Sequence, residues 1–132
     1  MSEGQVRVLL ADDEVHIRYL IRSLILAEGF TVVGEANNGE DALSLFREHR
    51  PDLTLIDINL PLKTGDAVLA EIMRDYPDAK VVMLTMVADA ATVKRCLEAG
   101  AVSYILKSNS RETIRQMLRE ALTIDAGEDG QP

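Results

Sequence analysis

The sequence predicts an α/β fold, a doubly wound parallel sheet built from five strands that alternate with five helices. Short apolar runs rich in β-branched residues recur along the chain, and segments with apolar residues at helical spacing separate them. Runs this short and continuous are typical of strands buried on both faces. We therefore expect helices to cover both faces of the sheet.

The first strand and helix are predicted from a β-prone run and the helical segment that follows it. The strand is expected over Val6–Ala11 and is interrupted by two aspartates. The helix is expected over Val15–Ala27, and Gly29 stops it in the manner usual for a helix C-terminus. Its inner face should be formed by apolar residues at helical spacing: Ile17, Leu20, Ile21, Leu24 and Ile25.

A second strand is expected over Thr31–Ala36, followed by a helix that Asn38 caps and that stops before Pro51. The third strand, Leu53–Asp57, is a short, mostly apolar and β-prone run that ends in a carboxylate. A half-buried carboxylate is costly unless a cation meets it. We therefore treat Asp57 as the first candidate functional residue.

The second half of the chain repeats the alternation. We expect a helix from Gly65 or Asp66 to Tyr76, a strand over Lys80–Leu84 that ends at Thr85, and a helix over about Asp89–Ala99, which Gly100 caps. The inner face of this helix is thin and padded with alanine. Its members should be Val93, Cys96 and Leu97.

The last strand is expected over Val102–Leu106 and continues into Lys107. The final helix should begin near Ser108 or Ser110 and carry the strongest amphipathic pattern of the chain. Residues 1–124 are predicted to form one domain, and residues 125–132 an acidic, Gly-rich tail or the start of a linker.

The composition narrows the function classes. A formal net charge of −8 argues against direct binding of nucleic acid or of an anionic membrane. A single cysteine, Cys96, excludes an internal disulfide framework and reads as a small core residue. No signal peptide is evident, and no apolar run approaches ~18 residues, so we expect a cytoplasmic protein with no membrane segment.

Polar residues follow four of the predicted strands. In a parallel sheet the C-terminal ends of the strands share one edge, and ligand chemistry gathers there. Three neighbouring carboxylates raise one another's pKa, and a hard divalent cation such as Mg²⁺ relieves that repulsion. The residues brought to this edge are Asp12, Asp13, Asp57, Thr85 and Lys107.

This set favours phosphoryl transfer to a carboxylate. Asp57 is the candidate nucleophile because it stands alone at a central strand, whereas Asp12 and Asp13 form a pair suited to metal. Lys107 and Thr85 would bind the phosphoryl oxygens. Each of these residues could instead have a purely structural role. The aspartate pair, for example, would place favourable negative charge at the N-terminus of the first helix.

With these motifs and Tyr104 on the last strand, the stretch Val6–Leu122 resembles the receiver domain of two-component response regulators. The resemblance implies a flavodoxin-like (βα)5 fold with strand order 2-1-3-4-5. It also implies that Asp57 is the phosphoacceptor and that Asp12, Asp13 and the backbone carbonyl of Asn59 bind Mg²⁺ together with it. Catalysis would be limited to the domain's own phosphorylation and dephosphorylation.

The resemblance also implies partners and an output. A sensor histidine kinase or phosphotransfer protein would donate the phosphoryl group, and Thr85 and Tyr104 would form the switch. The thin apolar face of the short fourth helix further suggests that this helix is the least costly element to move, so we expect it, the last strand and the last helix to be re-posed and to control a homodimer or an output domain. DNA binding would require a C-terminal domain beyond this chain. His16 and His49 are expected to be ordinary surface residues.

Short phrases such as Leu84-Thr85-Met86 and Leu106-Lys107-Ser108 look most similar to the receivers of LuxR/FixJ-type transcription regulators. Two residues depart from the wider family. Ser108 replaces a common proline, which makes a cis peptide there doubtful. Met86 stands where a small residue is commoner and would narrow access to Asp57.

Four alternatives stay open at this stage. An aspartate-nucleophile phosphohydrolase would normally carry a second aspartate where this chain has Asn59. A stand-alone receiver, or an unphosphorylated interaction module that keeps only the fold, would act through protein contacts alone. A flavin-binding module of similar fold lacks support, because no Gly-rich or Ser/Thr-rich phosphate loop follows the first strand.

Overall fold

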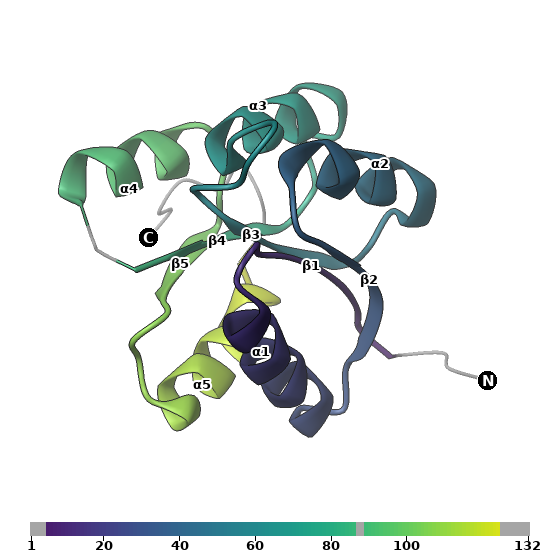
Figure 1. The fold of residues 1–132 in the computed structure, drawn as a ribbon, viewed down its shortest axis with the longest axis vertical. Coiled ribbons are helices and arrows are strands. Elements are labelled where there is room, and N and C mark those ends of the chain that lie inside the picture. The colour runs from purple at the N-terminus through teal and green to yellow at the C-terminus, as the bar shows by residue number, and fades with distance from the viewer. Residues whose placement is uncertain (1–4, 87–88, 125–132) are drawn as a thin grey trace.

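The computed structural model describes residues 5–86 and 89–124. Its parallel strands form one sheet in the order β2-β1-β3-β4-β5 (Figure 1). This is the doubly wound, flavodoxin-like arrangement that the sequence predicted. The predicted tail over residues 125–132 lies outside the described residues.

Strands and helices alternate strictly along the chain. The strands are β1 Arg7–Ala11, β2 Thr31–Ala36, β3 Leu53–Asp57, β4 Val81–Thr85 and β5 Ser103–Leu106. The helices are α1 Val15–Ala27, α2 Gly39–His49, α3 Gly65–Asp75, α4 Ala90–Glu98 and α5 Arg111–Ala121. The predicted strand starts at Val6, Lys80 and Val102 were one residue early.

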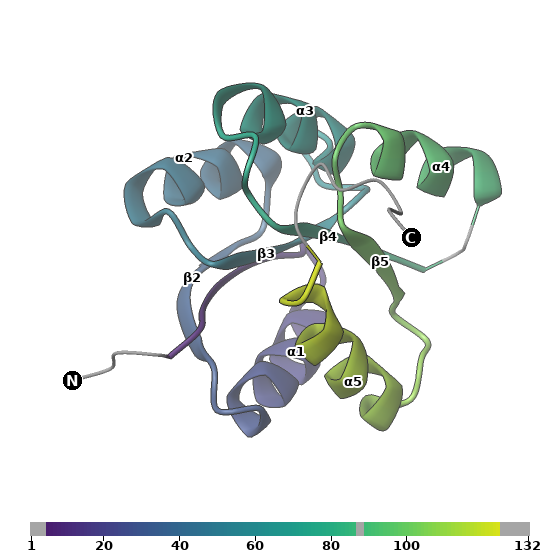
Figure 2. The same cartoon turned by 180° about the vertical axis from the view of Figure 1, so that it is seen from behind.

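The helices cover the sheet in two layers (Figures 1 and 2). Helices α1 and α5 pack on one face, and α2, α3 and α4 lie on the other. Alternate residues of β3 feed the two cores: Leu53 and Leu55 belong to the α1/α5 side, and Ile56 belongs to the opposite side. A central strand with helices on both faces is buried along its whole length, which explains why β3 is mostly apolar apart from Thr54 and the terminal Asp57.

Local sequence signals set several helix ends. The Asn38 side chain accepts a hydrogen bond from the Asp41 backbone N–H at 2.8 Å, as expected of an N-cap. Ser110, rather than Ser108, caps α5 by accepting from the Thr113 N–H at 3.1 Å. Gly29 follows α1 with a positive φ of 81°, a conformation that glycine adopts without a steric penalty.

Helix α4 has the smallest buried face of the five helices. Only Val93 and Cys96 of its residues are buried. The prediction that Leu97 completes this inner face was wrong, because Leu97 is 42% exposed. It lies one position after Cys96, and a rotation of about 100° per residue carries it round towards solvent.

A charged clamp joins the end of α1 to α5. Glu28 is only 5% exposed in its side chain and pairs with Arg115 at 2.6 Å and with Arg119 at 2.8 Å. Hydrogen bonds from Arg119 and Arg115 hold the pKa of Glu28 below its usual value. Folding therefore favours the ionised form of this carboxylate.

We expect Glu28→Gln to lower the free energy of unfolding by about 1 kcal/mol at pH 7, because both arginines are themselves substantially exposed. An acid whose pKa is depressed in the folded state stabilises it above the unfolded pKa, and this stabilisation is lost as the pH falls through the folded pKa. The difference between wild type and variant should thus shrink below about pH 4.5. Urea unfolding at several pH values measures it.

The exposed Glu48 supplies a matched control, and Glu48→Gln should leave stability nearly unchanged. A Glu28→Gln difference that persisted undiminished at acid pH would contradict the role assigned to the clamp.

Candidate functional site

The site is built from the ends of four strands. Asp12 directly follows β1, and Lys107 directly follows β5. Asp57 and Thr85 are the last residues of β3 and β4, which are adjacent in the sheet. Parallel strands thus bring residues up to 95 positions apart to one edge, as predicted.

The ammonium group of Lys107 lies at the centre of this edge. Its Nζ atom is 2.7 Å from Asp12 Oδ2, 3.0 Å from Glu14 Oε1 and 3.1 Å from Asp57 Oδ2. It donates hydrogen bonds to Glu14 and Asp57. One cation therefore holds carboxylates from two loops in contact with each other.

Burial strengthens this arrangement. The side chain of Lys107 is 2% exposed, and that of Asp12 is fully buried. Burial alone would lower the pKa of Lys107, but its hydrogen bonds and ion pairs with the carboxylates outweigh this and raise the pKa above its usual value. Lys107 is therefore a permanent cation at physiological pH.

For Asp12, in contrast to Lys107, the effect of burial on the pKa outweighs the effect of the ion pair and hydrogen bonds. Burial raises the pKa of its carboxyl group, although Lys107 and the Glu14 backbone N–H both act to lower it. The buried negative charge is thus only partly compensated by the protein itself. A second cation at this position would be favourable.

The aspartates have the geometry of a metal site. One carboxylate oxygen from each of Asp12, Asp13 and Asp57 lies within 4.8 Å of the others. Asp12 Oδ2 is buried and accepts no aligned hydrogen bond from the described part of the chain, although Lys107 Nζ is its ion-pair partner. Hard carboxylate oxygens with spare acceptor capacity fit Mg²⁺.

Close backbone packing fixes the loop after β3. The Asn59 backbone N–H donates to Asp57 Oδ1 at 3.1 Å, and the Gly65 N–H donates to the Ile58 carbonyl at 2.8 Å. A Cβ atom on Gly65 would lie 2.1 Å from the Asp57 carbonyl oxygen. Only glycine therefore lets α3 start this close to Asp57. The Asn59 carbonyl as a metal ligand stays a prediction.

Thr85 and Tyr104, the predicted switch pair, lie on adjacent strands. Thr85 is buried, and its carbonyl accepts a hydrogen bond from the Lys107 N–H at 2.8 Å. Tyr104 pairs in register with Met83 and is partly buried against the core that includes Cys96 of α4. The switch role itself stays a prediction.

The two departures noted in the sequence have simple structural outcomes. No cis peptide bond occurs among residues 5–86 and 89–124, so the Lys107–Ser108 peptide is trans. Met86 is 56% exposed, and its effect on access to Asp57 stays a prediction. His16 is exposed and His49 is half-exposed, and neither belongs to the carboxylate cluster.

Sequence reasoning missed two residues. Glu14 was assigned no role from the sequence, yet it is an ion-pair partner of Lys107. Arg18 lies on α1 and donates from Nη1 to the Asp12 backbone carbonyl at 2.9 Å. An acidic third residue after the aspartate pair was a usable signal for Glu14. Nothing local marked Arg18.

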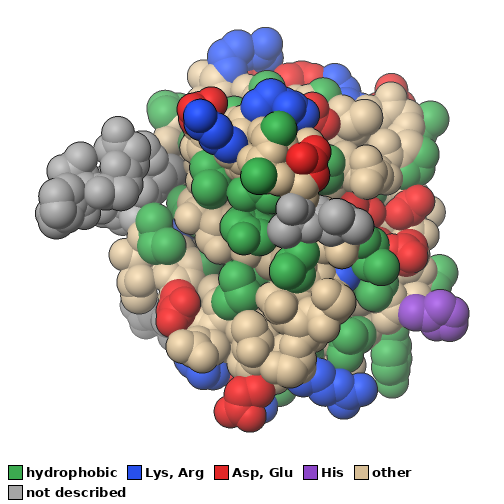
Figure 3. All heavy atoms as spheres, turned by 90° about the vertical axis from the view of Figure 1, so that its left-hand side faces the viewer, with side chains coloured by type: hydrophobic (Ala, Val, Ile, Leu, Met, Phe, Trp, Pro, Cys, Tyr) green, Lys and Arg blue, Asp and Glu red, His purple; other side chains and the backbone are tan. Residues whose placement is uncertain are grey.

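The face that carries α4 and β5 combines exposed apolar and charged residues (Figure 3). Hydrophobic side chains gather across its centre, and charged side chains lie towards its edges. Leu97 on α4 is exposed, and Tyr104 and Leu106 on β5 are half-exposed. β5 is also an edge strand of the sheet.

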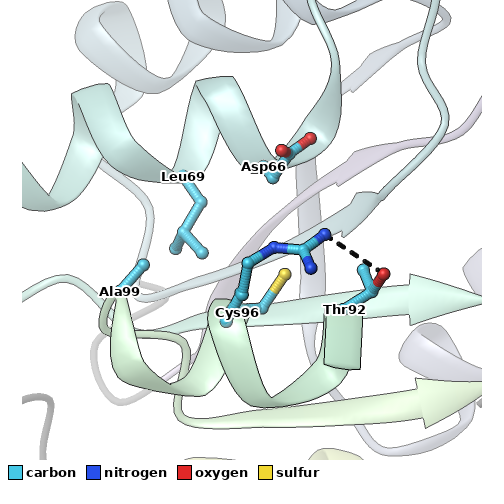
Figure 4. A pocket seen from close by; sticks show the side chains of 6 residues that line it. Asp66, Leu69, Thr92, Cys96 and Ala99 are labelled. Atoms are coloured by element: carbon cyan, nitrogen blue, oxygen red, sulfur yellow. Dashed lines mark hydrogen bonds between the residues drawn. The ribbon is translucent and has the colours of Figure 1, made fainter. Parts of the chain in front are cut away.

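A crevice of about 190 Å³ separates α3 from α4 (Figure 4). It is lined by Asp66, Leu69, Thr92, Arg95, Cys96 and Ala99. The Cys96 thiol is buried at its base, and burial raises the pKa of that thiol. This is typical of an unreactive core cysteine, as predicted. The space leaves α4 loosely packed on α3.

A family model described as the response regulator receiver domain matches residues 8–119. The chain belongs to the response regulator receiver family. It is accordingly a component of two-component signal transduction, and the resemblance stated from its motifs is confirmed.

Individual relatives support the same family assignment. A Pseudomonas aeruginosa protein named as a transcriptional regulator is 40% identical over 92% of this chain and 57% of its own length. A LuxR-family two-component response regulator from Aurantimonas has a TM-score of 0.85 at 30% identity, over 91% of this chain and 86% of its own. The Borrelia burgdorferi CheY of a CheX-CheY-BeF3-Mg complex has a TM-score of 0.84 at 29% identity, over 87% of each chain.

The receiver spans about half the length of the first curated regulators it matches, 57% and 53%. Its homologues thus include transcription regulators with further sequence outside the matched region. Within the residues that the structure describes, none of the helices combines the length and apolar character that a membrane crossing needs.

The buried Asp12 carboxylate generates a prediction about metal binding. Mg²⁺ at about 100 times its dissociation constant should stabilise the wild-type receiver by about 2.7 kcal/mol, because it binds only the folded state. Asp12→Asn should lose most of this stabilisation and should be at least as stable as wild type without Mg²⁺. Thermal unfolding with and without MgCl₂ measures both effects.

The exposed Asp78, in the turn between α3 and β4, provides the control: Asp78→Asn should retain the full response. An equal Mg²⁺ response in Asp12→Asn and wild type would refute the metal assignment.

Proposed function

We propose that Asp57 accepts a phosphoryl group from a sensor histidine kinase or phosphotransfer protein in a Mg²⁺-dependent reaction. The observation that supports this most directly is the position of Asp57 beside the Lys107 ammonium and within reach of the Asp12–Asp13 pair. The protein would catalyse only its own phosphorylation and dephosphorylation.

Each residue has a defined task in this reaction. An Asp57 carboxylate oxygen attacks phosphorus, and the bond from phosphorus to the donor nitrogen breaks. Lys107 compensates negative charge on the phosphoryl oxygens, and the Thr85 hydroxyl would donate to one of them. Asp12, Asp13, Asp57 and the Asn59 carbonyl would hold Mg²⁺. When bound, Mg²⁺ supplies charge neutralisation to the transferred group.

The rival hydrolase reading has less support. A phosphohydrolase of this architecture needs an acid two residues after the nucleophile, and this chain has an amide there, Asn59. The Asn59 backbone N–H instead binds Asp57. The unphosphorylated-module reading is disfavoured by the intact carboxylate cluster around Lys107.

Asp57→Asn should abolish labelling by radioactive acetyl phosphate plus Mg²⁺, because an amide is not a nucleophile of comparable strength. Acid-quenched gels or intact-mass analysis measure the label. Asp52, at the opposite end of β3, is the matched control, and Asp52→Asn should label like wild type. Full labelling of Asp57→Asn would place the acceptor elsewhere.

We propose that phosphorylation re-poses α4, β5 and α5. Thr85 would turn towards the new phosphoryl group, and Tyr104 would move into the space released. The loose packing of α4 makes it the least costly element to shift. The apolar face over α4 and β5 would then become a homodimer interface or contact an output domain, as in a transcription regulator.

BeF₃⁻ with Mg²⁺, a stable stand-in for the phosphoryl group, should convert wild type from monomer to dimer in analytical ultracentrifugation. Leu97→Glu on α4 should prevent dimerisation, because it places a charge in the interface, yet it should still be labelled at Asp57. Leu26→Glu is a matched control on α1, where Leu26 is 54% exposed. No change in mass or partner affinity for wild type would count against this output.

A stand-alone receiver is the second candidate. The observation that favours it is the close structural match to a CheY chain, of which this receiver covers 87%. In that case the α4–β5–α5 face would bind a different protein upon phosphorylation, with no DNA-binding domain involved.

A further inference from the structure

Arg18 makes an unusual connection between α1 and the loop that carries the acidic pair. From the first turn of α1, its Nη1 atom reaches back to the Asp12 backbone carbonyl at 2.9 Å. β1 ends at Ala11, one residue before Asp12. The Asp12 carbonyl therefore lies beyond the regular strand, and Arg18 supplies it with a donor.

Every other polar group of Asp12 has a different role. Its backbone N–H donates to the Ala36 carbonyl at 3.0 Å, which ties it to the end of β2. Its Oδ1 atom accepts from the Glu14 N–H at 2.8 Å, and Oδ2 lies against Lys107. Among the hydrogen bonds of Asp12 within the described residues, the one from Arg18 is made to its carbonyl oxygen.

The direction of the Asp12 carbonyl governs Asp13. The peptide between Asp12 and Asp13 is planar, so the carbonyl direction determines where the next Cα atom lies. Asp13 is exposed and is not held by burial, in contrast to Asp12. A loop whose peptide plane rotated would carry the Asp13 carboxylate away from Asp12 and Asp57.

Arg18 is itself held in place by β2. Its Nε atom pairs with Glu35 Oε1 at 3.3 Å, and the other oxygen of Glu35 pairs with Arg22 at 2.9 Å. The side chains of Arg18 and Glu35 are 22% and 25% exposed. Glu35 therefore restricts the guanidinium group to the orientation that meets Asp12.

We propose that Arg18, oriented by Glu35, is a positioning residue that sets the Mg²⁺ affinity of the receiver by fixing the peptide between Asp12 and Asp13. The inference rests on the Mg²⁺ binding contained in the proposed function. Arg18 touches neither the metal nor the phosphoryl group, and it acts through the backbone of the ligand loop.

The charge of Arg18 and its positioning role predict opposite changes in Mg²⁺ affinity when Arg18 is removed. The Arg18 guanidinium and Mg²⁺ are both positive and repel each other, so Coulomb's law predicts that removing Arg18 strengthens Mg²⁺ binding. Positioning predicts weaker binding when Arg18 is removed. The sign of the change in affinity therefore distinguishes the two roles.

The experiment is an Mg²⁺ titration of the unphosphorylated receiver, followed by NMR of backbone amides or by calorimetry. Arg18→Met keeps most of the apolar stem but removes every donor, and we expect its dissociation constant to rise about tenfold. Arg22→Met removes a neighbouring cation that also pairs with Glu35 but makes no contact with Asp12. Its affinity should be unchanged or slightly higher.

Two further variants guard against a simple folding defect. Arg18→Lys can still donate to the Asp12 carbonyl and should recover part of the affinity, and Glu35→Gln should show an intermediate loss. In acetyl phosphate labelling, Arg18→Met should need more Mg²⁺ for half-maximal rate but reach nearly the wild-type rate at saturation. A structural defect would lower the saturated rate instead.

The outcomes separate the two proposals. If wild type binds Mg²⁺ and Arg18→Met binds it equally or more tightly, the positioning role is overturned while the proposed function stands. If wild type binds no Mg²⁺, the metal-dependent function fails and this inference fails with it. If Mg²⁺ affinity falls as expected but Asp57 is never labelled, positioning stands and the phosphoacceptor assignment fails.

Discussion

A single ammonium group surrounded by carboxylates is the interaction on which this site depends. Lys107 is buried and meets Asp12, Glu14 and Asp57 within 3.1 Å. A buried cation is stable only with such partners, and buried carboxylates are stable only with such a cation. The loops after β1, β3 and β5 are consequently held to one another by charge. Because the acidic groups outnumber the lysine, the site retains a capacity for further positive charge.

The sheet supplies the rigid frame for this chemistry. β3 is buried along its whole length and ends at Asp57, between β1 and β4. Helix α3 begins against the backbone of Asp57, at a distance that only Gly65 permits. Asp57 is therefore positioned by packed backbone, and its carboxylate can vary little in position. Such rigidity lets a change of charge at Asp57 be transmitted to neighbouring elements.

Helix α4 is the most weakly packed helix of the described residues. Helix α4 buries only two residues and borders a crevice against α3. Its packing free energy is small compared with that of the central strands, so modest forces can displace it. A rigidly held carboxylate beside a weakly packed helix is a suitable arrangement for the proposed switch. The relatives of this receiver include both a protein named as a transcriptional regulator and a CheY solved in complex with CheX.

The sequence by itself determined the order and type of the elements, because apolar periodicity and local caps such as Asn38 and Ser110 are properties of short segments. It also determined that Asp12, Asp13, Asp57 and Lys107 share an edge, since parallel strands leave little choice. Only the tertiary structure decided that Glu14 pairs with Lys107, that Arg18 and Glu35 hold the Asp12 carbonyl, and that Leu97 is exposed. These contacts depend on helix rotation and on side chains that meet across different elements. The apolar periodicity of a short segment carries no information about contacts between side chains of different elements.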